Sequence, residues 1–134
     1  MAIKLFPYAD STGEIKYYTT DHIAINGKNL KEKTIYSNGL SVSAKASPNL
    51  SVNVASGQCS YNGKFLNSTT TVNVTISANT TNYNRYDLIV ADLSSTGSIK
   101  VVTGSASANP TTPTAGSNQI VLAKVLVGSN VSSI

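Results

Sequence analysis

Short runs in which apolar and polar residues alternate dominate the chain from residue 39 onward. Such runs occupy residues 40–45, 50–54 and 71–76, each with an apolar residue at every second position. Alternation of this kind places the apolar side chains on one face of an extended backbone, which predicts half-buried β-strands. Because helical periodicity is not sustained anywhere, the pattern predicts an all-β protein.

Two nearly continuous apolar runs predict strands that are buried more deeply. Residues 86–93 are closed by the Ser94–Gly97 turn, after which residues 98–104 return as a strand, and residues 120–127 form the second run. Runs this short, bounded by turn residues, are typical of core strands rather than helices.

A tight hairpin is predicted at Asn62-Gly63, because both positions of this turn need a positive φ angle. It joins residues 59–61 to residues 64–66. The total is about seven or eight short strands with turn signals roughly every ten residues, which predicts an antiparallel β-sandwich.

The first part of the chain lacks this regularity. Residues 4–7 predict a strand that Pro7 ends, and residues 14–18 a short extended segment. We expect residues 21–37 to be irregular, with a short helix near residues 30–33. The predicted organisation is an N-terminal arm over residues 1–38 and a β-sandwich domain over residues 39–134.

A concentrated polar group stands at the start of the central strand. Arg85 and Asp87 are two positions apart, so an extended backbone projects both side chains from the same face. A charge that enters a core is costly unless it is paired and hydrogen-bonded. We therefore predict an ion pair that acts as a structural clamp.

Residues 105–118 are rich in Ser, Ala, Thr and Pro. Pro110 and Pro113 exclude a central strand, so this segment is predicted to be a long surface loop. Asn109, Pro110 and Pro113 are the candidate residues for contacts with a neighbouring protein.

Composition argues against several classes of function. Only 12% of the residues are charged, and no basic run with interleaved aromatics predicts nucleic-acid binding. Cys59 is the only cysteine and His22 the only histidine, so a disulfide and a zinc site both fail on residue count. No cofactor is implied. A secretory signal and a membrane-spanning stretch are not found either, so we expect no membrane partner.

Catalysis is not expected. Glycoside hydrolysis needs two carboxylates that face each other, whereas Asp87 and Asp92 are five positions apart on one strand and therefore lie on opposite faces. A Cys59–His22 pair has no supporting signature. Ser/His/Asp catalysis would also require His22, and no serine stands in a nucleophile elbow.

The order of the segments resembles a β-sandwich module of baseplate and tail-tip proteins from tailed phages that infect Gram-positive bacteria. It is similar to the shoulder domain by which receptor-binding proteins of such phages attach to the virion. The segments that carry this resemblance are residues 51–57, 61–65, 84–90, 99–104, 109–113 and 122–127.

The resemblance covers about residues 39–134 and does not include a receptor-binding head. It implies a structural virion protein with an attachment or adaptor role in host adsorption, made in the host cytoplasm and located in the phage tail tip. The implied partners are other tail or baseplate proteins and further copies of the chain, arranged as a trimer or hexamer.

An alternative function is a carbohydrate-binding module that recognises a host cell-wall saccharide. β-Sandwiches often carry such sites, although this is an analogy at the level of the fold. Aromatic platforms would be needed, and the chain has no tryptophan. The candidate aromatic residues are Tyr17, Tyr18, Tyr36, Tyr61, Tyr83 and Tyr86.

Overall fold

The computed structural model describes residues 3–6, 8–9, 15–16 and 33–134. Over these residues all of the regular elements are β-strands, and every pairing between them is antiparallel. The all-β prediction is therefore confirmed. The strands are β1 (Ile3–Phe6), β2 (Tyr8–Ala9), β3 (Ile15–Lys16), β4 (Thr34–Tyr36), β5 (Val42–Ala44), β6 (Ser51–Val54), β7 (Gly57–Tyr61), β8 (Lys64–Ser68), β9 (Val72–Thr75), β10 (Arg85–Asp92), β11 (Ser98–Val102) and β12 (Gln119–Val127).

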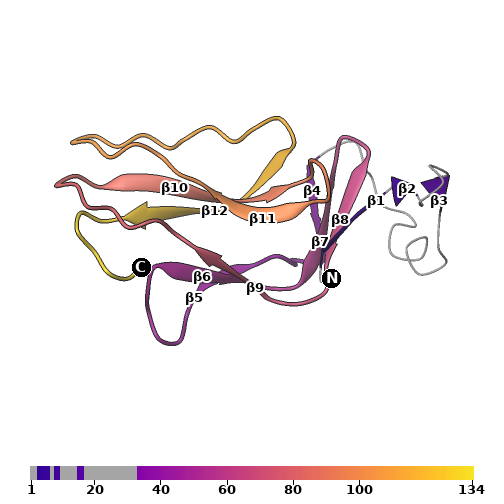
Figure 1. The fold of residues 1–134 in the computed structure, drawn as a ribbon, viewed down its shortest axis with the longest axis horizontal. Coiled ribbons are helices and arrows are strands. Elements are labelled where there is room, and N and C mark those ends of the chain that lie inside the picture. The colour runs from indigo at the N-terminus through magenta and orange to yellow at the C-terminus, as the bar shows by residue number, and fades with distance from the viewer. Residues whose placement is uncertain (1–2, 7, 10–14, 17–32) are drawn as a thin grey trace.

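Two three-stranded sheets form a sandwich. Their strand orders are β11-β10-β12 and β5-β6-β9, and Figure 1 shows them as two layers. The inward side chains of β6 and β9, such as Val54 and Val74, belong to the same buried cluster as Ile89 of β10 and Ile120 of β12. This cluster is the hydrophobic core of the sandwich.

A third sheet lies across one end of the sandwich, with the strand order β1-β8-β7-β4 (Figure 1). Cys59 of β7 and Leu66 of β8 are fully buried and extend the core into this sheet. The short strands β2 and β3 pair with each other. The third sheet, which contains the β7–β8 hairpin, thus covers one end of the core.

Most of the predicted strands are present. The alternating runs form β5, β6 and β9, and the two apolar runs form β10 and β12. At the predicted hairpin, Asn62 and Gly63 have φ angles of 51° and 76°, which are the positive values that this turn requires. The hairpin prediction is confirmed.

Strand β10 is buried on both faces, which explains its continuous apolar sequence. Ile89 and Ala91 point into the core between the sheets. Leu88 and Val90 alternate with them, so they face the other way, yet they are only 3% and 0% exposed. Segment 103–118 runs along that side of the sheet (Figure 1).

Two backbone hydrogen bonds fix this segment to the sheet. Ser107 N donates to Asn84 O at 3.1 Å, just before β10 begins. Leu93 N donates to Asn118 O at 2.9 Å, just after β10 ends. The predicted loop is therefore a cover for the outer face of β10 as well as a connection.

The prediction of an irregular segment up to residue 37 was wrong at β4. Thr34, Ile35 and Tyr36 pair with Ser60, Cys59 and Gln58 of β7. Three residues are too few to show an alternating pattern, although all three have side chains that favour strands. The helix expected near residues 30–33 lies outside the described residues except for Lys33, which belongs to no regular element.

The division of the chain between residues 38 and 39 stays a prediction. Two strands on its N-terminal side pair with strands on its C-terminal side. These pairings are β1 with β8 and β4 with β7.

Candidate functional site

The predicted ion pair stands at the start of β10. Arg85 Nε donates to Asp87 Oδ1 at 2.9 Å, and Arg85 Nη2 donates to Asp87 Oδ2 at 3.0 Å. The two residues are 7% and 0% exposed. Two parallel hydrogen bonds between a guanidinium and a carboxylate are the strongest form of such a pair. The ion-pair prediction is confirmed, and its role as a clamp stays a prediction.

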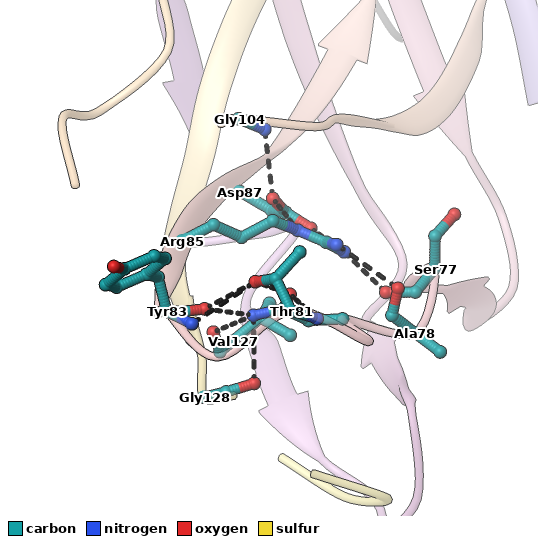
Figure 2. Close-up of polar contacts among 10 residues, drawn as sticks. Ser77, Ala78, Thr81, Tyr83, Arg85, Asp87, Gly104, Val127 and Gly128 are labelled. Carbon is teal, nitrogen blue, oxygen red and sulfur yellow. Dashed lines mark hydrogen bonds and ion pairs between the residues drawn. The ribbon is translucent and has the colours of Figure 1, made fainter. Parts of the chain in front are cut away.

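Each partner of the ion pair also binds a neighbouring segment (Figure 2). Arg85 Nη1 donates to Ala78 O at 3.3 Å, and Nη2 donates to Ser77 O. Gly104 N, which follows β11, donates to Asp87 Oδ1 at 3.0 Å. The pair therefore links β10 to the chain that follows β9 and to the chain that follows β11.

Gly104 is required by close packing. A Cβ atom at this position would lie 2.1 Å from Tyr86 O, a backbone atom that cannot move independently of β10. Only glycine lets the two backbones approach so closely that the Gly104 amide reaches the carboxylate.

Asn79 extends the cluster and was not identified from the sequence. Its Nδ2 atom donates to the carbonyl oxygens of Tyr83, Val127 and Gly128 at 2.8, 3.2 and 3.1 Å. Its Oδ1 atom accepts hydrogen bonds from the backbone N and the Oγ1 of Thr81. The residue is 2% exposed. An Asn followed by Thr two residues later signals the local turn, but not the long-range bonds to β12.

A second polar cluster surrounds Asp92 at the other end of β10. Its carboxylate accepts hydrogen bonds from Ser94 N at 2.8 Å and Gln119 Nε2 at 3.0 Å, and Lys100 Nζ lies 2.6 Å from Oδ2. Burial alone would raise the pKa of Asp92. The hydrogen bonds from Lys100, Ser94 and Gln119 outweigh this effect and hold the pKa well below its usual range.

The two carboxylates do not form a joint site. Asp87 and Asp92 are the only acidic residues in positions 33–134. Each is buried and bound within its own cluster, on opposite faces of β10 as the spacing predicts. Across the described residues, no buried side-chain nitrogen or oxygen lacks a hydrogen-bond partner. Each cluster therefore connects β10 to neighbouring segments of the chain.

The other candidate residues lie apart from these clusters. Asn109 is exposed, whereas Pro110 and Pro113 are half-buried, and the latter packs near Gly104. Cys59 is fully buried, as its alternating context predicts, and burial raises the pKa of its thiol to about 12. Tyr17, Tyr18 and His22 lie outside the described residues.

The described tyrosines do not form a single platform. Lys33 Nζ lies 5.0 Å from the Tyr61 ring centre, and Lys124 Nζ lies 4.7 Å from that of Tyr86. These rings belong to different sheets. Tyr83 is 53% exposed, and the Tyr36 ring packs against Phe65 with the centres 6.2 Å apart.

In the part of the chain that the structure describes, no group of three or more His, Cys, Asp or Glu side chains could hold a metal ion. The same part contains no helix long and apolar enough to cross a membrane. Comparison of the chain with protein-family models, with curated proteins and with solved structures finds no match.

Proposed function

We propose that the chain is a structural virion protein of a tailed phage, a baseplate or tail-tip component with an attachment or adaptor role in host adsorption. The segments that carry the resemblance support this proposal. Residues 84–90, 99–104 and 122–127 contribute to the three strands of one sheet, β10, β11 and β12. Three of the six segments therefore lie side by side in one sheet.

The observation that carries the assembly role is the outer edge of β12. This nine-residue strand is the last strand of its sheet, and no described strand pairs with its outer side. Val121 and Leu126 are 44% and 51% exposed, and their register partners Val90 and Tyr86 place them on the face away from the core. A long edge strand with exposed apolar side chains favours pairing with another chain.

The partner proposed for this edge is a further copy of the chain, in a trimer or hexamer. In a cyclic assembly each subunit uses two different patches, so the edge of β12 would contact a second surface of its neighbour. Other tail or baseplate proteins would then bind the assembled ring. No chemical step is assigned to the protein.

Light scattering on the purified chain tests the oligomer. We expect a mass three or six times the 14.0 kDa of one chain. Leu126→Lys should lower this mass, because it places a charge in the contact. Ile35→Lys, which makes the same change at an exposed site on β4, should leave it unchanged. A monomeric wild type, or equal masses for wild type and Leu126→Lys, would contradict the use of this edge.

A further inference from the structure

A polar cleft lies where the third sheet meets the sandwich, remote from the clusters at β10. Its volume is about 420 Å³. Tyr36, Gln58 and Asn67 line it, together with hydroxyl groups that include those of Ser56, Ser68 and Thr69. None of the described residues that line it is charged. The cleft therefore combines one aromatic ring with amides and hydroxyls.

Three of these side chains form a row across three strands. Tyr36 of β4 is the register partner of Gln58 of β7, which is in turn the partner of Asn67 of β8. Directly opposed residues of antiparallel strands project from the same face, so the ring and the two amides point to the same side. All three are half-buried.

The side-chain amides of Gln58 and Asn67 make no hydrogen bonds within the described part of the fold. In contrast, the amides of Asn79 and Asn73 are bonded. A primary amide offers two N–H donors and a carbonyl acceptor. Two adjacent amides thus present donors and acceptors to whatever occupies the cleft.

The rim of the cleft has an unusual backbone. Ser37, Asn38 and Leu40 have φ angles of 53°, 52° and 57°, in the left-handed region that residues with a Cβ atom rarely adopt. A Cβ on Gly39 would lie 2.8 Å from the Cα of Gly57, so this turn is pressed against the start of β7. The turn is also closed by the hydrogen bond from Gly39 N to Tyr36 O at 3.0 Å, so the fold holds this rim of the cleft in place.

We propose that this cleft binds an uncharged saccharide unit. A sugar ring has an apolar face that suits the half-buried ring of Tyr36, and its neighbouring hydroxyl groups both donate and accept hydrogen bonds. The amides of Gln58 and Asn67 match that alternation. A charged ligand would gain no ion pair from the described residues that line the cleft and would lose its hydration.

This proposal does not depend on the virion role. The cleft and the edge of β12 involve different strands, so each can be disabled without the other. A failure of subunit assembly and a failure of saccharide binding are therefore distinguishable.

The test is an array of immobilised neutral and acidic glycans probed with the full-length chain. We expect binding to a subset of neutral glycans that high salt leaves unchanged. The best neutral glycan is then titrated into ¹⁵N-labelled protein, where the side-chain amide signals of Gln58 and Asn67 should shift. Binding to acidic glycans alone, or to no glycan, would overturn the proposal.

Two variants locate the site. Gln58→Met and Asn67→Leu keep the shape of the side chains but remove the amides, and each should weaken the best neutral glycan by about tenfold, as expected for a lost polar contact. Asn82→Leu makes the same change as Asn67→Leu at an exposed position between β9 and β10 and should leave binding unchanged. If both cleft variants bind as tightly as wild type, the glycan occupies another surface and the proposal is wrong.

Discussion

Removing the Arg85 side chain should strongly destabilise the sandwich. Arg85→Ala removes two hydrogen bonds to Asp87 and two to the carbonyl groups of Ser77 and Ala78. The Asp87 carboxylate is 0% exposed and would keep only the Gly104 amide as a partner among the described residues. The variant therefore leaves a buried charge without its counterion.

The cost follows from that orphaned carboxylate. Removing one partner of a buried ion pair typically destabilises a protein by about 3–5 kcal/mol. The total stability of a domain is about 5–15 kcal/mol, so this single change should remove a large share of it. Arg85→Ala combined with Asp87→Ala no longer buries a lone charge. The double variant should therefore cost less than the sum of the single variants, by about 1–3 kcal/mol.

Urea denaturation followed by far-ultraviolet circular dichroism measures these changes, since the chain has no tryptophan to report on unfolding. Lys45→Ala is the control, because Lys45 is a half-buried cation without an ion pair in the described residues, and it should change stability by less than about 0.5 kcal/mol. A loss below about 1 kcal/mol for Arg85→Ala, or strict additivity in the double variant, would refute the clamp.

Three further predictions concern other parts of the core. The pKa of Asp92 lies below its ordinary value of 3.8, so the stability that its bonds contribute is complete above that value and is lost as the pH falls through the lowered pKa. In Asp92→Asn, the free energy of urea unfolding should therefore fall less steeply as the pH is lowered below that value. The same dependence on pH in the variant and the wild type would contradict this. Gly104→Ala should cost about 3 kcal/mol or more in urea unfolding because its Cβ would collide with Tyr86 O, and an unchanged free energy of unfolding would contradict this. Cys59, with a thiol pKa near 12, should resist a thiol-reactive dye at pH ~8 until the protein unfolds, and rapid labelling of the native protein would show that the site is open.

The sequence predicts the elements whose signals are local. Alternating runs identify β5, β6 and β9, and the Asn62-Gly63 pair identifies the hairpin, because periodicity and turn chemistry depend on neighbouring residues. The Arg85–Asp87 pair is predictable for the same reason, since two residues on one strand two positions apart share a face.

Features that depend on distant segments were missed. The three residues of β4 favour a strand individually but are too few to show a pattern, and their strand forms against the edge of β7. The Asn79 side chain donates a hydrogen bond to the end of β12, almost fifty positions away, and no local sequence pattern predicts this contact. The row of Tyr36, Gln58 and Asn67 likewise arises from the register of three strands. Registers between distant strands are set by the packing of the whole core.

The most direct test of the proposed function is to locate the protein on a virion. An antibody raised against the purified chain, coupled to gold, would be applied to tailed-phage particles whose genome encodes it and viewed by electron microscopy. We expect gold at the tail tip, on intact particles and on isolated tails. Particles that carry no label, or label confined to the capsid, would contradict the assignment as a baseplate or tail-tip component.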